Sequence, residues 1–267
     1  MNNNSIQIRI KILEMIHQSK SSHIASCYSI VDILEYLYSG HLNVDCRKPL
    51  KTDRDRLIIS KGHAAAAVYA TLGYYNFFDQ KELDLYAKNS SIFMSHVSDK
   101  VPGVEFATGS LGHGLPFGVG KALWAKRNKE NWKVYVLLSD GELNEGSNWE
   151  AIMFASHHKL SNLNIIIDSN KLQSLDTTEN TIDMIDLNSK FSAFGCEVTE
   201  FNGNNHDEIN KAFTSKKYTN MPQVYIANTI KGKGVDFMEN TVAWHYKSPS
   251  KDEYEKALDI LLCAMNT

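Results

Sequence analysis

Apolar residues at the start of the chain recur every three to four positions, which is the period of an amphipathic helix. They are Ile6, Ile10, Leu13 and Ile16, with His17 beside the last of them. The serine-rich stretch 19–22 interrupts this pattern, so we expect the first helix to end there. A second helical pattern follows over residues 26–38.

Five short apolar runs farther along the chain predict strands. They cover residues 56–60, 134–138, 164–168, 195–200 and 224–228. Consecutive apolar positions are typical of strands covered on both faces, and the helical patterns between them supply the crossovers that a parallel sheet requires. The sequence therefore predicts a doubly wound α/β fold, with a mostly parallel sheet and helices on both faces. No repeat or linker divides residues 1–267, so we expect one domain.

Composition and charge narrow the classes of partner. Of the 267 residues, 43% are hydrophobic and 22% are charged, which is typical of a folded protein. The net charge of −3 argues against a basic face for nucleic acid or an anionic membrane. The four cysteines show no CxxC spacing, and the first twenty residues contain no signal-like apolar run. We therefore expect a cytoplasmic protein that binds small molecules.

Polar residues that suit a metal site follow two of the predicted strands. Asp140 comes just after the run 134–138, and Asn170 just after the run 164–168. One predicted crossover helix, over residues 147–159, connects them, so both side chains can converge at the carboxyl edge of the sheet. A carboxylate, an amide oxygen and a nearby backbone carbonyl are hard ligands suited to Mg²⁺ and a diphosphate. Gly141 would let the backbone approach that diphosphate.

The same two segments carry a family resemblance. Ser139-Asp140-Gly141, followed at this distance by Asn170-Lys171-Leu172, resembles the thiamine diphosphate signature. Further segments in the same order are similar to transketolase. They are Ser60-Lys61-Gly62-His63, Pro102-Gly103-Val104-Glu105 with Thr108-Gly109-Ser110-Leu111-Gly112, Glu142-Leu143-Asn144-Glu145-Gly146, and Ile230-Lys231-Gly232-Lys233-Gly234 with Trp244-His245. Together they extend over residues 19–249.

The resemblance implies a thiamine diphosphate-binding fold and a set of cofactor contacts. Asp140, Asn170 and the main-chain carbonyl of Leu172 would hold Mg²⁺, or another divalent cation such as Ca²⁺ or Mn²⁺. Gly141 and His63 would contact the diphosphate. The whole implied cofactor-binding set is His63, Gly109, Ser110, Leu111, Asp140, Gly141, Glu142, Asn170 and Leu172. Gly109 and Leu111 would approach the aminopyrimidine ring through their backbones.

The resemblance also implies that four histidines surround the reacting centre. They are His23, His63, His96 and His245. Cleaving a ketose beside its carbonyl requires a hydroxyl proton to leave, and neutral imidazoles can orient such hydroxyls and relay protons near pH 7. Any one of these histidines, taken alone, is more often a surface or structural residue.

Two glutamates, Glu145 and Glu150, lie at and within the predicted crossover helix. Carboxylates near a helix N-terminus are favoured by the helix dipole alone. In the family, glutamates at these positions face the subunit interface, so we expect interface residues and not primary catalysts.

The sequence departs from the family pattern at several positions. Ser139 replaces the first Gly of the signature, Ser110 replaces Pro, and His113 replaces Gln. Neither His23 nor His96 has its usual neighbouring Pro-Gly. We expect these changes to leave the cofactor-binding residues in place and to affect which sugar the enzyme uses.

The larger departure from the family is length. A full transketolase continues into a pyrimidine-binding domain and a C-terminal domain, and neither is in this sequence. The resemblance therefore implies an N-terminal subunit that needs a C-terminal partner, in an expected α₂β₂ assembly. The complex would transfer a two-carbon ketol unit from a ketose to an aldose or keto-sugar acceptor, with sugars or sugar phosphates as substrates. The alternatives are acyl or acyloin transfer from a decarboxylated 2-oxo acid, and a non-catalytic cofactor-binding scaffold.

Overall fold

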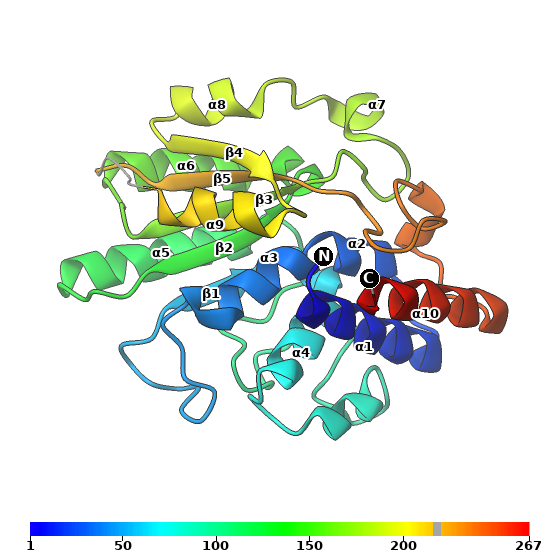
Figure 1. Cartoon of the computed structure of the whole chain (residues 1–267). Coiled ribbons are helices and arrows are strands. Elements are labelled where there is room, and N and C mark those ends of the chain that lie inside the picture. Colours follow the sequence, from blue (N-terminus) through cyan, green and yellow to red (C-terminus); the bar gives the residue numbers. More distant parts are fainter. Residues whose placement is uncertain (216–219, 267) are drawn as a thin grey trace.

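The computed structural model describes residues 1–215 and 220–266 and is built around a parallel sheet. Its five strands lie in the order β1-β2-β3-β5-β4 (Figure 1). Their bounds are β1 Arg56–Ile59, β2 Val134–Ser139, β3 Leu163–Ser169, β4 Glu197–Asn202 and β5 Gln223–Asn228. The predicted parallel α/β fold is confirmed.

Four of the five strands start within one residue of their predicted positions, and β4 starts two residues late. Gly195, which we expected to open that strand, has a φ of 80° and donates its N–H to Ser192 O at 2.9 Å. This left-handed glycine follows the C-terminus of α8, so the chain becomes extended only after it.

Helices cover the sheet and connect its strands. The α-helices are α1 Asn3–Ser19, α2 Ile24–Ser29, α3 Val31–Tyr36, α4 Ala65–Tyr74, α5 Gly114–Arg127, α6 Gly146–His157, α7 Thr178–Ile182, α8 Leu187–Ala193, α9 His206–Thr214 and α10 Lys251–Met265. Shorter helical turns are η1 Leu37–His41, η2 Gly62–Ala64, η3 Gln80–Leu85, η4 Gly141–Asn144 and η5 Val242–His245. Helix α1 ends at Ser19 and α6 covers the predicted crossover, as expected.

The second predicted helix is not continuous. Ile30 (φ −102°, ψ −1°) separates α2 from α3, and the last turn, η1, is a π-helical turn that contains Gly40. The Ser29 hydroxyl donates to the Asp168 carboxylate at 2.7 Å and also lies 3.0 Å from Ser26 O. Serine side chains that contact the local backbone compete with helical hydrogen bonds. The contact of Ser29 with Ser26 O therefore lies where the helix is interrupted.

Each strand sends alternate side chains into two different cores. In β2, Tyr135 and Leu137 face the core formed with α1, α2, α3, α4, α9 and α10, whereas Val134, Val136 and Leu138 face the core formed with α5, α6 and α8. Strands β3 and β5 alternate in the same way. Both faces are therefore buried under helices, which is the doubly wound arrangement that the apolar runs predicted.

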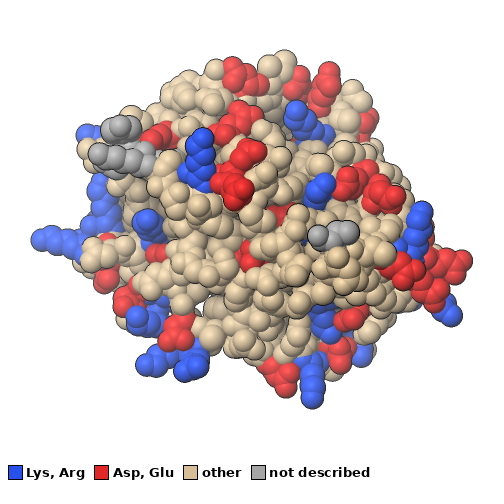
Figure 2. All heavy atoms as spheres, in the orientation of Figure 1, with Lys and Arg blue, Asp and Glu red and all other residues tan. Residues whose placement is uncertain are grey.

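Charged side chains of both signs are interspersed on the face shown in Figure 2, without a large basic field. The N-terminal helix α1 and the C-terminal helix α10 pack against each other beside the sheet (Figure 1). Within residues 1–215 and 220–266, no helix combines the length and the apolar character needed to cross a bilayer.

Candidate functional site

A cavity of about 250 Å³ lies where β1, β2, β3 and β5 end. Its lining comes from loops that follow these strands and from the segments that precede α2 and α5. The lining residues are His23, Ser26, Lys61, His63, His96, Gly109, Leu111, Ser139, Asp140, Gly141, Asn170, Leu172, Gln173, Ser174, Lys231, His245 and Tyr246. A groove of about 1000 Å³ adjoins it, shares Asp140, Asn170 and Leu172, and extends along residues 177–188.

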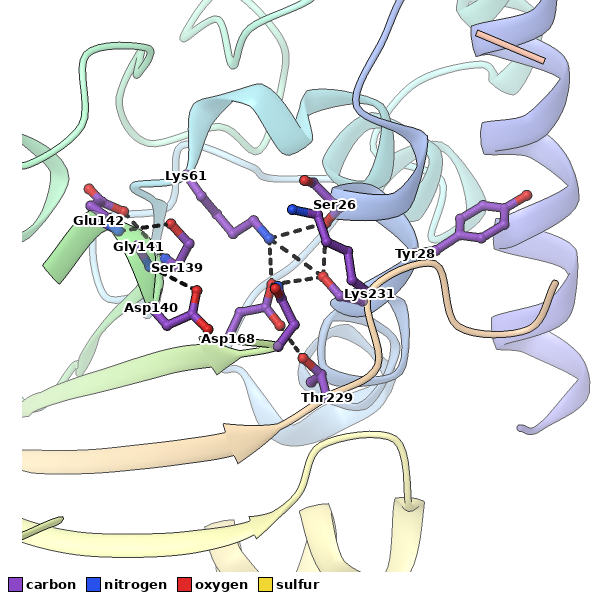
Figure 3. Close-up of polar contacts among 12 residues, drawn as sticks. Ser26, Tyr28, Lys61, Ser139, Asp140, Gly141, Glu142, Asp168, Thr229 and Lys231 are labelled. Carbon is purple, nitrogen blue, oxygen red and sulfur yellow. Dashed lines mark hydrogen bonds and ion pairs between the residues drawn. The ribbon is translucent and has the colours of Figure 1, made fainter. Parts of the chain in front are cut away.

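Asp140 lies directly after β2 and is buried at this cavity (Figure 3). Its carboxylate accepts hydrogen bonds from the backbone N–H of Gly141 at 2.8 Å and from that of Lys171 at 2.6 Å. Burial and the nearby Asp168 raise the pKa of Asp140 to about 6. A buried carboxylate with these surroundings is well placed to gain from a cation.

Asn170 and Leu172 lie in the loop after β3, in which Lys171 takes a left-handed backbone conformation (φ 63°). The Asn170 side chain accepts from Leu172 N–H at 3.1 Å and donates to Asp168 at 3.0 Å. The Leu172 carbonyl accepts from Lys231 Nζ at 2.9 Å. Both residues line the cavity together with Asp140, so the structure brings the predicted metal ligands to one place.

The side chain of Asp168 is fully buried beneath this site. It pairs with the buried ammonium of Lys61 and accepts from the hydroxyls of Ser29 and Thr229 (Figure 3). Lys61 Nζ also donates to Ser26 O at 3.1 Å. These contacts fix Lys61, which lines the cavity.

Lys231 brings a second ammonium to the cavity. It donates to Leu172 O and, at 3.0 Å, to Gln173 O, and it lies 3.0 Å from His245 Nδ1. Burial and the charge of Lys61 lower the pKa of Lys231 to about 8. Lys61 is already paired with Asp168, whereas Lys231 contacts carbonyls and an imidazole, so its charge can favour an anionic ligand such as a diphosphate.

The four predicted histidines lie close together, with His23 at the centre. Its ring centroid is 5.2 Å from that of His63, 6.0 Å from that of His96 and 5.1 Å from that of His245. The rings of His63 and His245 are 5.6 Å apart. All four side chains line the cavity, so residues far apart in the sequence form one imidazole cluster.

Burial and nearby cations keep three of these imidazoles neutral. Burial first, and then the charges of His96 and the two lysines, lower the pKa of His23 to about 4. Burial and Lys231 lower the pKa of His245 to about 3. Burial and Lys61 place the pKa of His63 well below its usual range. Neutral rings can both accept and donate protons at neutral pH.

The remaining predicted cofactor contacts divide into two groups. Gly109, Leu111 and Gly141 line the cavity, whereas Ser110 is exposed and does not line it. Glu142 is fully buried away from it, where its carboxylate accepts from Ser60 Oγ and, at 2.9 Å, from Gly112 N–H. This position suits a residue that fixes the 109–114 segment and not one that contacts a ligand.

Glu145 and Glu150, the predicted interface residues, are exposed at and within the start of α6. Glu145 is the N-cap residue of that helix, and its side chain lies beside Gly112, where an added Cβ would be 2.7 Å from it. Neither glutamate lines the cavity.

No role was predicted from the sequence for Lys61, Asp168 or Lys231. Lys61 and Lys231 lie inside two of the motifs, which is a signal that could have found them. Asp168 is the last but one residue of β3, and the sequence pattern makes it part of an apolar strand. Its buried ion pair depends on residue 61, which only the fold brings near.

The residues at the cavity fit a divalent cation and a diphosphate. Asp140, Asn170 and Leu172 offer one carboxylate, one amide oxygen and one carbonyl, and Lys61 and Lys231 offer positive charge. Among the residues that the structure describes, no three His, Cys, Asp or Glu side chains gather as a metal site. An oxygen-rich site with a single carboxylate suits Mg²⁺ bound together with phosphate oxygens, and not zinc.

Comparisons with known proteins agree with this chemistry. Residues 2–261 match the family model described as transketolase, thiamine diphosphate binding domain. The chain is 41% identical over 251 residues to an apulose-4-phosphate transketolase subunit of Phocaeicola vulgatus, covering 94% of this chain and 89% of that one. It is 34% identical over 253 residues to the 6-deoxy-6-sulfo-D-fructose transketolase subunit SqwG of a Clostridium species, covering 94% of this chain and 92% of that one.

Full-length transketolases match over less of their own length. Human transketolase is 35% identical over 253 residues, which cover 94% of this chain and 40% of the human protein. The solved structure of transketolase from Campylobacter jejuni superposes with a TM-score of 0.90 at 31% identity, covering 98% of this chain and 43% of that one. The chain belongs to the transketolase family and corresponds to its thiamine diphosphate-binding part.

Proposed function

We propose that this chain is the cofactor-binding subunit of a two-component transketolase-like enzyme. The complex transfers a two-carbon ketol unit from a ketose donor to an aldose or keto-sugar acceptor. One observation carries the proposal: a cation site, two buried ammonium groups and four imidazoles line one cavity. A scaffold that only stabilises a partner would not need this combination.

The cation site consists of Asp140, Asn170 and the Leu172 carbonyl, and it takes Mg²⁺ or a similar divalent ion such as Ca²⁺ or Mn²⁺. Loading requires Asp140 to be ionised and the Leu172 oxygen to share or release its hydrogen bond from Lys231. Lys61, Lys231, His63 and Gly141 then face the diphosphate. Thiamine diphosphate supplies the nucleophilic carbon and the electron sink for cleaving the bond beside the donor carbonyl.

The imidazoles serve the proton transfers of the reaction. A neutral His23 or His245 nitrogen accepts the proton that leaves the donor hydroxyl, and returns it when the acceptor takes up the two-carbon unit. The depressed pKa values of both residues keep them unprotonated until this step. His96, which is exposed, orients hydroxyls from the open end of the cavity.

The partner subunit completes the site. A carboxylic acid facing the aminopyrimidine and the groups that bind a sugar phosphate come from a C-terminal subunit with a pyrimidine-binding domain, in an α₂β₂ complex. The names of the relatives from Phocaeicola vulgatus and Actinobacillus succinogenes, each called one subunit of a transketolase, support a partner. Residues 1–267 form the single cofactor domain of this chain, and the expected cytoplasmic location stays a prediction.

Ketol transfer on mixing the two subunits tests this function. With thiamine diphosphate, Mg²⁺ and a ketose donor, the chain alone should be inactive and the complex active. In the complex, Asp140→Ala should weaken thiamine diphosphate binding by at least about 100-fold in calorimetry, because a charged metal ligand is lost. Asp84→Ala, on the exposed η3 turn, is the matched control. Turnover by the chain alone contradicts the two-component proposal, and unchanged affinity in Asp140→Ala contradicts the cation site.

A further inference from the structure

Tyr246 is an exposed aromatic residue at the rim of the cavity. It lines the cavity and is 60% exposed. Of the tyrosines in residues 1–215 and 220–266, it alone ranks among the exposed large hydrophobic side chains. Tyr246 takes part in none of the proposed cofactor contacts, so cofactor binding does not explain why an aromatic side chain is exposed at this cavity.

The backbone holds Tyr246 in a defined place. It follows η5, and its N–H donates to Ala243 O. The preceding Trp244 is buried and donates its indole N–H to Phe237 O at 3.0 Å, and the carbonyl of His245 accepts from His23 N–H at 2.9 Å. The aromatic ring is therefore carried on an anchored turn and not on a free loop.

The ring of Tyr246 contacts two members of the imidazole cluster. It meets His245 with centroids 4.7 Å apart at 68°, and His23 at 5.6 Å and 64°. Both contacts are edge-type and leave most of the side chain exposed toward the cavity rim. Within the described part of the chain, its hydroxyl makes no hydrogen bond, so a ligand can use both the ring and the hydroxyl.

The charges near the rim indicate what kind of ligand group lies there. The next residue, Lys247, directs its ammonium over the Trp244 ring at 4.4 Å and pairs with Glu253. That cation is engaged outside the cavity. Tyr246 therefore presents an apolar ring with one hydroxyl, which suits the C–H and O–H groups of a sugar better than a phosphate.

The lining residues differ in exposure, and this distinguishes the closed end of the cavity from its open rim. Lys61 is buried at the closed end, His63 is half-buried, and His96 and Tyr246 are exposed. Under the proposed function, the carbons that react lie at the imidazoles. The rest of a ketose then extends toward the exposed end, where Tyr246 lies.

We propose that Tyr246 is a specificity-determining residue for the donor sugar, an inference that rests on the proposed function. Its ring packs against the C–H groups beyond the transferred two-carbon unit, and its hydroxyl hydrogen-bonds to a hydroxyl of that part. A donor without this part gains nothing from Tyr246. Hydroxypyruvate is such a donor, since a carboxylate that leaves as CO₂ takes the place of the sugar chain.

The experiment compares kcat/KM for a ketose with kcat/KM for hydroxypyruvate in the assembled complex. The ketose is whichever of erythrulose, xylulose 5-phosphate and fructose 6-phosphate the wild type uses best. Tyr246→Ala should lower the ketose-to-hydroxypyruvate ratio about tenfold, and Tyr246→Phe about threefold, mainly through KM. Tyr254→Phe, which removes a hydroxyl from α10, should change the ratio less than about twofold. Thiamine diphosphate affinity, measured in parallel, should stay unchanged in all three variants.

Two outcomes separate this inference from the proposed function. If the wild-type complex transfers ketol units and both Tyr246 variants keep its donor ratio, the specificity role is overturned while the proposed function stands. Equal losses on both donors also overturn it, because the ring would then act by supporting His23 and His245. If the wild type transfers no ketol unit from any ketose, the proposed function fails, and the inference fails with it.

Discussion

His23 occupies a left-handed backbone conformation with φ 74°, which is unusual for a residue with a side chain. Such a conformation costs of order 1–3 kcal/mol and persists only where the surroundings determine it. Here the hydrogen bond from His23 N–H to His245 O and the contacts among four rings do so. The backbone thus aims the imidazole at the centre of the cluster.

Replacing single histidines with Ala tests their roles at the residue scale. In the assembled complex, His23→Ala, His96→Ala and His245→Ala should each lower ketol-transfer rates by about 10² to 10⁴-fold, the usual contribution of general acid–base groups. Cofactor affinity should change much less than the rate, because none of the three is a proposed ligand of the cation, and His245 acts on the diphosphate site only through Lys231. His63→Ala should lose both affinity and rate. Wild-type rates in all of the first three variants would make the cluster structural and the proposed mechanism wrong.

The depressed imidazole pKa values also predict how stability depends on pH. The folded chain keeps His245 neutral to about pH 3, whereas an unfolded histidine takes up a proton near pH 6.5. Below about pH 6.5 the unfolded state therefore binds more protons, and the free energy of unfolding falls as the pH drops. Urea unfolding of the cofactor-free chain between pH 7 and pH 5 should show a shallower decline for His245→Gln. An identical decline would contradict the buried neutral imidazole, and the exposed His157→Gln is the control.

At the residue scale, several of the side chains that line the cavity were predictable from the sequence, but the burial of each side chain was not. Asp140, Asn170 and His63 follow strands, and strand order alone brings them to one edge. Glu142 lies two residues after Asp140 in the sequence, yet it turns into the protein because Ser60 and Gly112 offer hydrogen-bond donors there. These hydrogen-bond partners come from distant segments. The spacing of residues along the chain therefore could not distinguish a residue that contacts a ligand from one that only holds a neighbouring segment in place.

At the scale of elements, Arg9 ties three segments together. Its guanidinium, fully buried in α1, donates to both carboxylate oxygens of Asp32 on α3, at 3.0 and 2.8 Å. Its Nε donates at 2.8 Å to the carbonyl of Lys233, two residues beyond Lys231. Burial alone would raise the pKa of Asp32, but the charge of Arg9 and hydrogen bonds from His206, Arg9 and Asn204 hold it below its usual range.

Removing this guanidinium should destabilise the chain. Arg9→Met leaves the Asp32 carboxylate buried without its main partner, so the free energy of unfolding should fall by about 3–5 kcal/mol in urea titrations. Lys11→Met, which removes a partly exposed cation from the same helix, should cost less than about 1 kcal/mol. If Arg9→Met unfolds at the wild-type urea concentration, the ion pair does not stabilise the fold. The double variant Arg9→Met/Asp32→Leu should recover part of the loss.

Helices and strands were predictable from the sequence where the spacing of apolar residues followed a single period. The strands and α1 followed from apolar runs and helical spacing. The break between α2 and α3 did not, because residues 26–38 keep a helical pattern while Ser29 contacts Asp168 from β3. A contact with a distant segment leaves no mark on the apolar pattern of a helix, so the sequence alone could not reveal it.

At the scale of the whole molecule, α5 and α6 carry several exposed apolar side chains. Trp124 on α5 is 54% exposed, and Met153 and Phe154 on α6 are 52% and 44% exposed. The two helices pack side by side, and Glu150 is exposed on α6. These side chains are consistent with the interface that we predicted for Glu145 and Glu150.

The mass of the complex measured by light scattering should equal that of two copies of each subunit. Met153→Asp should reduce it to one copy of each, because a carboxylate would be buried without a partner in the interface. Leu50→Asp, a change at a residue that is 85% exposed on another surface, should leave the mass unchanged. A wild-type complex with one copy of each subunit would contradict the α₂β₂ arrangement.

The strand order has a consequence for how the chain is made. Among the residues that the structure describes, β4 pairs only with β5, which is synthesised after it and lies between β3 and β4 in the sheet. During synthesis at about 5–20 residues per second, both β3 and β4 must therefore wait for residues 223–228 to leave the ribosome before the sheet can close. Until then the free edge of β3, whose residues are all buried in the finished protein, is open to other chains. An unpaired edge of this kind favours aggregation of the nascent protein until residues 223–228 emerge and pair with it.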